Sequence, residues 1–176
     1  KSFYNSKKNL NIEFIDSYLI HSPFSPIEDL VKVYRTMEEF VQAGEVGQIG
    51  ISNCYDFKLL SYLYDIAKIK PKVVQNRFYS ESSYDKEIRA FCKQKNITYQ
   101  SFWSLTANPH VLKSDIVQEL AKKYEKTVEQ VFYKFLNEIN ITPLNGTTSQ
   151  IHMIEDLDIK SFSLESCEVD SISNLL

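Results

Sequence analysis

Short apolar stretches alternate along the chain with longer stretches in which apolar residues recur at helical spacing. The short stretches are rich in β-branched and aromatic residues and are closed by polar or turn-forming residues, which is typical of buried strands. They comprise residues 14–20, 46–51, 72–75, 97–102 and 139–144, the last interrupted by Asn140. The pattern therefore predicts five strands, each followed by one or more helices.

Spacing and capping residues mark the helices between these strands. Leu30, Tyr34 and Met37 are three or four residues apart, so the first long helix has one apolar face, and Gly44 ends it. Residues 25–28, Ser-Pro-Ile-Glu, have the spacing of a capping box with Pro at the first helical position. Caps of later helices are predicted at Asp56, Ser114 and Thr127. Strands that alternate with helices indicate a parallel sheet, because each parallel neighbour needs a long crossover connection.

Composition and charge exclude several classes of protein. With 43% hydrophobic and 24% charged residues, the chain is neither collagen-like nor disordered. Its formal net charge of -3 comes with no basic block, so no nucleic-acid partner is expected. No apolar run approaches the ~18 residues of a membrane span. The cysteines Cys54, Cys92 and Cys167 are too widely spaced for a disulfide framework or a metal site, which favours a reducing, cytoplasmic location.

Polar or aromatic residues stand at the carboxyl end of each predicted strand. They are His21, Ser52, Asn53, Gln75, Phe102, Trp103 and residues 145–147. In parallel strand-helix folds, ligands bind at the carboxyl ends of the strands, where the loops converge. Although turn formation would explain any one of these positions, the five together predict a shared pocket.

Each strand-end residue also has a purely structural explanation. The His21 imidazole would donate a hydrogen bond to a substrate carbonyl or would be satisfied by backbone, and the residues alone favour neither. Gln75 would contact a ligand or bridge two parts of the structure. Phe102 and Trp103 would stack on a planar ring or pack in the core.

Familiar catalytic and phosphate-binding motifs are absent from the sequence. It contains no GxGxxG, GxxxxGK, GxSxG, HExxH or CxxC pattern. The neighbouring carboxylates Glu38 and Glu39, and the pair Asp156 and Asp158, are expected to be solvated surface charges. His110 is also expected at the surface.

Two of the strand-end segments resemble a known family. Residues 14–23, FIDSYLIHSP, are similar to the strand of aldo-keto reductases that reads YIDLYLIHWP, and residues 44–53, GEVGQIGISN, resemble that family's GKVRxIGVSN. Further family segments are matched in the expected order by residues 74–76, 91–93 and 126–131. The resemblance runs from about residue 8 to the end of the chain. It implies an α/β fold of the (β/α)8 TIM-barrel type.

That family's members transfer hydride from NADPH to an aldehyde or ketone. In them a Tyr, tuned by a Lys and an Asp, is the general acid, and a His orients the carbonyl; this resemblance places His21 at the catalytic His. Ser52, Asn53 and Gln75 fall where the nicotinamide carboxamide is held. Phe102 falls on the aromatic residue that stacks on the nicotinamide ring. The other implied cofactor positions are Trp103, Leu105, Thr147, Ser149, His152, Glu155 and Asp156.

The chain departs from the family pattern at several positions. Gly146 and His152 replace two basic residues that usually grip the 2'-phosphate of NADPH, so a weakened 2'-phosphate site is expected and the cofactor is NADP or NAD. Arg77, Trp103 and Ser104 stand where Glu, Ser and Pro are usual. The substrate is expected to be a small carbonyl compound, and the oligomeric state stays open.

Length adds a further expectation. A complete eight-fold barrel typically needs about 250 residues, whereas this chain has 176 and begins at Lys1 rather than Met. Residues 1–176 are therefore expected to form one barrel domain that lacks its amino-terminal strands. The family's catalytic Asp, Tyr and Lys precede the strand that ends in the His, so the chain alone is expected to be inactive. The alternatives are a non-catalytic binding or regulatory relative and a half-barrel that closes by dimerising.

Overall fold

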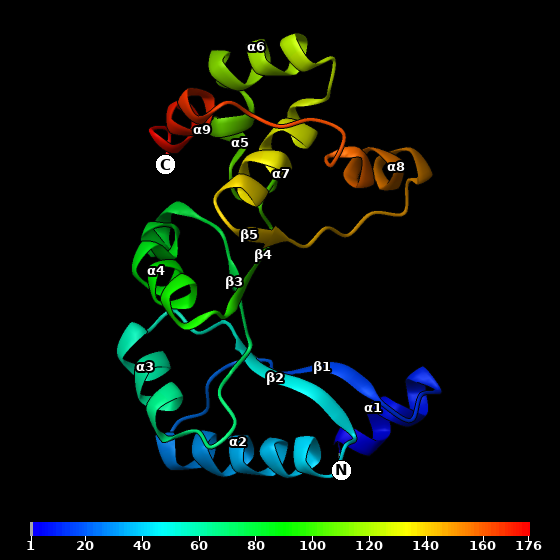
Figure 1. The fold of residues 1–176 in the computed structure, drawn as a ribbon, viewed down its shortest axis with the longest axis vertical. Coiled ribbons are helices and arrows are strands. Elements are labelled where there is room, and N and C mark those ends of the chain that lie inside the picture. Colours follow the sequence, from blue (N-terminus) through cyan, green and yellow to red (C-terminus); the bar gives the residue numbers. More distant parts are fainter. Residues whose placement is uncertain (1) are drawn as a thin grey trace. The chain divides into compact units, whose positions relative to one another are not determined.

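Parallel strands and helices alternate along the chain in the computed structural model, which describes residues 2–176 (Figure 1). The strands are β1 (Ile15–Ile20), β2 (Val46–Ser52), β3 (Val73–Arg77), β4 (Thr98–Phe102) and β5 (Ile141–Pro143). The helices are α1 (Ser2–Leu10), α2 (Ile27–Gln42), α3 (Phe57–Ile66), α4 (Lys86–Lys95), α5 (Pro109–Leu112), α6 (Asp115–Tyr124), α7 (Val128–Glu138), α8 (Gln150–Asp158) and α9 (Ser166–Ser173), with a 3-10 helix at Ser80–Asp85. All five predicted strands are present in the predicted order.

The chain divides into two compact units. The first runs to Asn76 and includes Ala90–Thr98, and the second comprises Arg77–Arg89 and Tyr99–Leu176. Each unit has its own strands, helices and buried apolar side chains.

The first unit is a parallel sheet covered by helices. Strand β1 pairs with β2, which in turn pairs with β3, all in parallel, and Gly50 stands opposite Val73. Helix α2 packs against β2, and Leu30, Ile49 and Leu60 are fully buried. Gly50 is required by close approach, because a Cβ there would overlap the carbonyl oxygen of Val73.

Most of the predicted helix caps are present. Asp56 caps α3 by accepting the backbone N–H groups of Lys58 and Leu59 at 2.8 and 3.2 Å. The capping box predicted at residues 25–28 is wrong. Helix α2 begins one residue later than expected, so Pro26 occupies the N-cap position and makes no side-chain capping bond.

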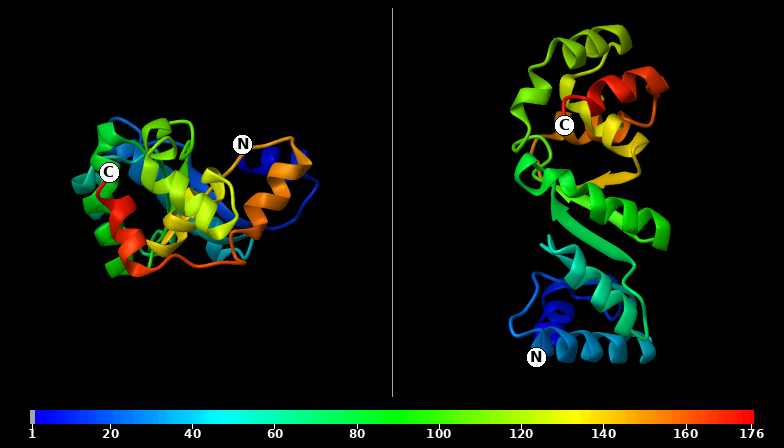
Figure 2. Two further views of the ribbon diagram at one scale, coloured as in Figure 1. Left: turned by 90° about the horizontal axis from the view of Figure 1, so that it is seen from above. Right: turned by 90° about the vertical axis from the view of Figure 1, so that its left-hand side faces the viewer.

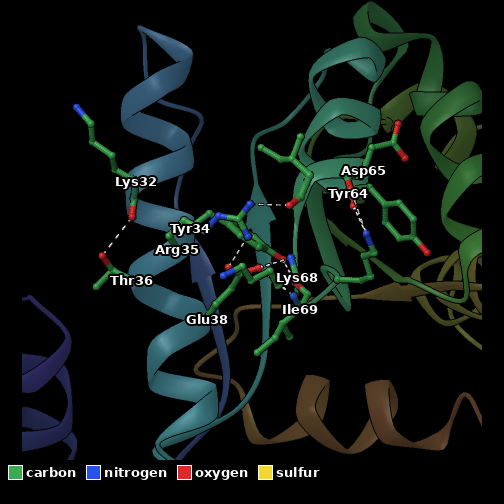
Figure 3. Close-up of polar contacts among 11 residues, drawn as sticks. Lys32, Tyr34, Arg35, Thr36, Glu38, Tyr64, Asp65, Lys68 and Ile69 are labelled. Atoms are coloured by element: carbon green, nitrogen blue, oxygen red, sulfur yellow. Dashed lines mark hydrogen bonds and ion pairs between the residues drawn. The ribbon is translucent and has the colours of Figure 1, made fainter.

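Glu38 is buried, contrary to the prediction of a solvated surface charge. Only 2% of the residue is exposed. Its Oε1 accepts the backbone N–H groups of Lys68 and Ile69 at 2.6 and 2.9 Å, and its Oε2 pairs with the Arg35 guanidinium at 2.7 Å (Figure 3). Glu38 lies one helical turn after the buried Tyr34 and therefore shares the inward face of α2. Its carboxylate ties that helix to the segment that follows α3.

Helix α7 is the centre of the second unit. It contacts β5 as well as α5, α6, α8 and α9, and Val131, Phe132 and Phe135 are fully buried. Figure 2 shows α6, α7 and α9 side by side. The predicted capping box at Thr127 is present, with Thr127 and Gln130 satisfying each other's backbone N–H groups. Strand β4 pairs in parallel with β5.

Among residues 2–176, no helix is both long enough and apolar enough to cross a bilayer.

Candidate functional site

Four of the predicted site residues meet at the carboxyl ends of strands in the first unit. Asn53 Nδ2 donates a hydrogen bond of 2.8 Å to the carbonyl oxygen of His21, which follows β1. Ser52 Oγ donates to the carbonyl oxygen of Gln75 on β3 at 2.8 Å, and the backbone N–H of Asn53 donates to the same oxygen at 3.0 Å. The parallel register places these ends side by side. The structure therefore brings His21, Ser52, Asn53 and Gln75 together.

Asn53 is the residue that ties this group together. Its backbone is left-handed, with φ of 53°, a conformation that Asn tolerates better than most residues. Besides bonding to His21, its amide donates to Ser52 Oγ at 3.3 Å, and its Oδ1 accepts the Tyr55 hydroxyl at 3.3 Å. The side-chain amide is thus held in one orientation by the chain itself.

His21 is exposed and borders a cavity of about 380 Å³. Apolar and aromatic side chains of α1, β1 and α2 make up most of the cavity wall, among them Phe3, Tyr18 and Met37. The contact with Asn53 uses the backbone of His21 and not its ring. The sequence did not predict this cavity, because the apolar pattern predicts each helix and strand of its wall separately and does not show how they pack together.

In the second unit, Trp103 is not packed in the core. It is 57% exposed and directly follows β4. The Arg77 guanidinium carbon lies 4.2 Å from the centre of the Trp103 ring and 5.2 Å from that of Tyr79. Phe102 is half-buried, and its carbonyl oxygen accepts the backbone N–H of Phe78 at 3.2 Å. Of the two explanations left open for Trp103, the structure excludes core packing.

Buried polar contacts hold the turn that presents Trp103. The hydroxyls of Ser101 and Ser104 are 2.8 Å apart and both residues are buried. The fully buried Asn108 donates through Nδ2 to the carbonyl oxygens of Ser104 and Phe78, each at 2.8 Å. Sequence reasoning missed Asn108; its place immediately before Pro109 was the available signal, since an Asn before a Pro favours a turn.

A second group of predicted residues surrounds a cavity of about 410 Å³ in the second unit. Leu105, Thr147, His152, Glu155 and Asp156 line it, together with Thr127, Glu129, Tyr133, Asn145 and Gly146. Ser149 is absent from the lining and instead caps α8 by accepting the backbone N–H of His152 at 3.4 Å. The α7 residues of the wall were not foreseen, because their spacing indicated only a capped helix.

The chemistry of this cavity is acidic. Three carboxylates line it, from Glu129, Glu155 and Asp156, and no Lys or Arg is among the lining residues. Burial, with Asp156 and Glu129 adding to it, raises the pKa of Tyr133 to about 12, so its phenol stays neutral at physiological pH. Asn145 Nδ2 donates to the Asp156 carboxylate. Such a wall suits neutral donors such as a ribose diol or an amino group, and it repels a phosphate dianion.

Asp158 is a surface charge, as expected, because 39% of its side chain is exposed, but it is also paired. It accepts hydrogen bonds from Lys126 at 2.6 Å and from Gln130 at 3.1 Å. The Lys126 contact is the main reason that the pKa of Asp158 is lowered. His110 is exposed as expected, although it lies in the one-turn helix α5. Within residues 2–176, no group of three or more His, Cys, Asp or Glu side chains is arranged to hold a metal ion.

The sequence matches known proteins along its whole length. Residues 1–176 match the sequence model of the aldo/keto reductase family. The chain is 29% identical over 174 residues to a glyoxal reductase of Bacillus subtilis (strain 168), which covers 99% of this chain and 61% of that protein. It is 30% identical over 192 residues to a D-galacturonate reductase of Fragaria ananassa, which covers 97% of this chain and 59% of that protein.

Solved structures agree with the sequence match. MGS-M4, an aldo-keto reductase from a Medee basin deep-sea metagenome library, superposes with a TM-score of 0.89 at 28% identity, covering 98% of this chain and 63% of that one. A mutant of Gox0644 in complex with NADPH shares the fold, with a TM-score of 0.88 at 22% identity, covering 99% of this chain and 63% of that one.

These comparisons confirm the predicted fold class. The chain spans about three fifths of the length of the curated relatives it matches. Its five parallel strands and their helices form an incomplete barrel of the strand-helix type found in the solved aldo-keto reductases. Members of this family bind NAD(P)H and act on small carbonyl compounds. Because the family match extends over all 176 residues and the fold is shared, this chain belongs to the aldo/keto reductase family.

Proposed function

We propose that the chain belongs to an NAD(P)H-dependent oxidoreductase that reduces an aldehyde or ketone to an alcohol. The observation that carries the proposal is the meeting of His21, Ser52, Asn53 and Gln75 at neighbouring strand ends, joined by hydrogen bonds of 2.8 to 3.0 Å. Ligands of parallel strand-helix folds bind at this edge. The family resemblance assigns the same four positions to the reacting end of the cofactor and substrate.

In this proposal His21 acts on the substrate carbonyl. Its imidazole N–H donates a hydrogen bond to the carbonyl oxygen and stabilises the negative charge that develops there. When bound, the dihydronicotinamide supplies the hydride. The contact from Asn53 to the His21 carbonyl oxygen fixes the backbone that carries the imidazole. His21 therefore orients and polarises the carbonyl without itself supplying the proton that completes the alcohol.

The proton donor is a separate requirement. In the family this donor is a Tyr, tuned by a Lys and an Asp, on strands that precede the one ending in the His. Among residues 1–176, the positions that match the family are those of the carbonyl-orienting His and the cofactor contacts. We therefore expect residues 1–176 by themselves, which we propose form a single barrel domain, to bind the cofactor without turning over substrate.

The nicotinamide end of the cofactor is assigned to the first group of residues. Ser52, Asn53 and Gln75 hold the carboxamide, for which an oriented amide and hydroxyl offer both donors and acceptors. Phe102 stacks on the ring, with Trp103 and Leu105 beside it. Stacking on an aromatic face suits a planar ring and needs no charge.

The adenosine end is assigned to the acidic cavity, with Thr147, Glu155 and Asp156 as its contacts. The carboxylates of Glu155 and Asp156 accept hydrogen bonds from ribose hydroxyls or from the adenine amino group. A 2'-phosphate would meet three carboxylates and His152 instead of fixed positive charges. The cavity therefore favours NADH over NADPH.

Fluorescence titration tests this proposal directly. Trp103 is the only tryptophan in the chain, so energy transfer from its indole to bound dihydronicotinamide reports binding near β4. We expect saturable quenching by both cofactors, with NADH bound about tenfold more tightly because charge repulsion penalises NADPH. N-acetyltryptophanamide at matched absorbance is the control for inner-filter effects. Absence of binding by either cofactor at millimolar concentration would contradict the proposal.

One observation favours a second candidate, a non-catalytic relative that binds or regulates without cofactor chemistry. The Asn53 amide is already engaged by His21, Ser52 and Tyr55. A cofactor carboxamide would have to share or displace these contacts. The same titration separates the candidates, since only the oxidoreductase requires the dihydronicotinamide to bind.

The partner is proposed from the family and the cellular location from the cysteine content. A small carbonyl compound is the proposed partner, and a cytoplasmic location is proposed from the few, widely spaced cysteines. Neither a nucleic acid nor a membrane is part of the proposal.

A further inference from the structure

We propose that two adjoining cavities of the second unit together bind an alkylammonium ion, in which an ammonium head group is carried on an apolar chain. One is the acidic cavity, and the other is an apolar groove beside it. The inference goes beyond the proposed function, because it concerns a ligand other than the cofactor and the carbonyl substrate. A cation bound there would compete with the adenosine end of a cofactor.

The acidic cavity carries a negative charge that no neighbouring cation offsets. Its carboxylates belong to Glu129, Glu155 and Asp156. Within residues 2–176, none of the three is paired with a Lys, Arg or His side chain. In the same part of the chain they are not arranged to hold a metal ion. A larger cation that meets the carboxylates through several hydrogen bonds suits this wall.

Tyr133 is a buried polar side chain in the wall of the same cavity. The residue is only 6% exposed, and among the described residues its hydroxyl has no hydrogen-bond partner. Asp156 and Glu129 act on the phenol electrostatically, so its hydroxyl belongs to the acidic side of the wall. Buried hydroxyls normally have a partner. An ammonium N–H supplies one, since the neutral phenol oxygen accepts hydrogen bonds and the ring face attracts a cation.

An apolar groove of about 420 Å³ adjoins the acidic cavity. Tyr133, Asn145 and Asp156 line both, so the two cavities share part of one wall. The rest of the groove wall is formed by Pro143, Met153, Leu157 and Ile159. Met153 and Leu157 lie on α8, which follows β5 (Figure 1), and are 46% and 73% exposed. A hydrocarbon chain in the groove would cover apolar surface that otherwise contacts water.

The junction of the two cavities selects the ligand. Asp156 stands at this junction, and its carboxylate accepts a hydrogen bond from the uncharged Asn145 amide. A carboxylate has lone pairs for further donors, and an ammonium there forms charge-assisted hydrogen bonds. The chain that carries the ammonium then enters the groove. A neutral alcohol lacks the charge and a short ammonium ion leaves the groove empty, whereas an alkylammonium satisfies both cavities.

Isothermal titration calorimetry of the full chain without cofactor tests this inference. Hexylamine, which is protonated at neutral pH like a Lys side chain, is compared with hexanol and with methylamine. We expect saturable binding of hexylammonium and at least about tenfold weaker binding of each of the other two, because one lacks the charge and the other lacks the chain. Equal affinity of hexylammonium and hexanol would overturn the proposal, and so would equal affinity of hexylammonium and methylammonium.

Variants locate the binding site. Asp156→Asn keeps an acceptor for the Asn145 amide but removes the charge, and should weaken hexylammonium binding about tenfold. Tyr133→Phe keeps the ring but removes the hydroxyl, and should weaken it about fivefold. Glu119→Gln is the matched control and should leave binding unchanged, because Glu119 is exposed on α6 of the same unit and lines neither cavity.

The remaining outcomes separate this site from general charge effects. An equal loss from Glu119→Gln and Asp156→Asn would overturn the proposal, since net charge alone would then attract the cation. Tighter binding of magnesium ions than of hexylammonium would overturn it in favour of a metal site. The ligand comparison uses the unmodified chain, so it stands whether or not a variant folds. Because no cofactor is present, failure here leaves the NADH titration interpretable, and failure of that titration leaves this one interpretable.

Discussion

The carboxylate of Glu38, on α2, accepts a hydrogen bond of 2.6 Å from the backbone N–H of Lys68, in the segment that follows α3. The same carboxylate also accepts the N–H of Ile69, while Arg35 supplies the opposite charge and bonds to the carbonyl oxygen of Ile66 (Figure 3). Burial favours protonation of Glu38, yet these three donors outweigh burial and lower its pKa. The ionised carboxylate is therefore a structural tie between two helices of the first unit.

Glu38→Gln should destabilise the chain by about 2 kcal/mol, since it weakens the bond to Arg35 and replaces one acceptor with a buried donor. The measurement is the free energy of unfolding in urea. Glu39→Gln is the matched control, because Glu39 is the exposed neighbour on the same helix, and a change within about 0.5 kcal/mol is expected there. Equal effects of the two substitutions would show that helix charge and not the tie is responsible.

The stability that the Glu38 carboxylate contributes should depend on pH. The pKa of Glu38 is lowered in the folded state from its ordinary value of 4.5. A lowered pKa contributes stability that is fully present above the unfolded-state value and is lost as pH falls through the folded-state value. The difference in unfolding free energy between the unmodified chain and Glu38→Gln should therefore shrink as pH falls below about 4.5. A difference that stays constant down to acid unfolding would contradict this.

The strand ends and most caps could be predicted from sequence, whereas the environments of single polar residues could not. Asp56 and Thr127 accept backbone N–H groups only two or three residues away, so their role as helix caps can be predicted from the sequence. Glu38 acts on backbone donors 30 and 31 residues away, which no local pattern reports. The exposure of Trp103 could not be predicted either. Its apolar character predicts burial, and the left-handed backbone that directs the side chain to solvent is not apparent in the sequence.

The N-cap of α2 was predicted one residue too early. The capping-box pattern at residues 25–28 requires Ser25 to be the N-cap, but Pro26 takes that place and leaves Glu28 one position too early in the first turn.

The acidic cavity could be predicted only in part. Its α8 residues follow from the family resemblance, whereas Glu129 and Tyr133 reach the cavity from α7 through tertiary packing, which the local sequence pattern does not report.

Gly50→Ala should destabilise the first unit by about 2 kcal/mol, because the added methyl group overpacks a closed site. The new Cβ would overlap the Val73 carbonyl oxygen and lie 2.8 Å from a methyl carbon of Leu19. Gly146→Ala is the matched control, since nothing lies within 4 Å of a Cβ there. Thermal unfolding followed by circular dichroism measures both. A smaller loss at Gly50 than at Gly146 would contradict the close approach of β2 and β3.

His152→Arg should improve NADPH binding about tenfold while leaving NADH binding nearly unchanged, because a guanidinium forms charge-assisted bonds to a phosphate. His152 lines the acidic cavity near Glu155 and Asp156. The added cation offsets the carboxylates where a 2'-phosphate would lie. Titration of both cofactors against Trp103 fluorescence gives the ratio of dissociation constants.

Gln150→Arg is the control for this change, because Gln150 is exposed, lies on the same helix and is not part of the cavity wall. It adds the same charge to α8 without placing it at the cavity. If the NADPH gain comes from a local contact, it should be confined to His152→Arg and should survive physiological salt, where the screening length is about 8 Å. An equal gain from Gln150→Arg that disappears with salt would show that the helix attracts the phosphate only through its net charge, and the acidic cavity would then not be the site of the adenosine end.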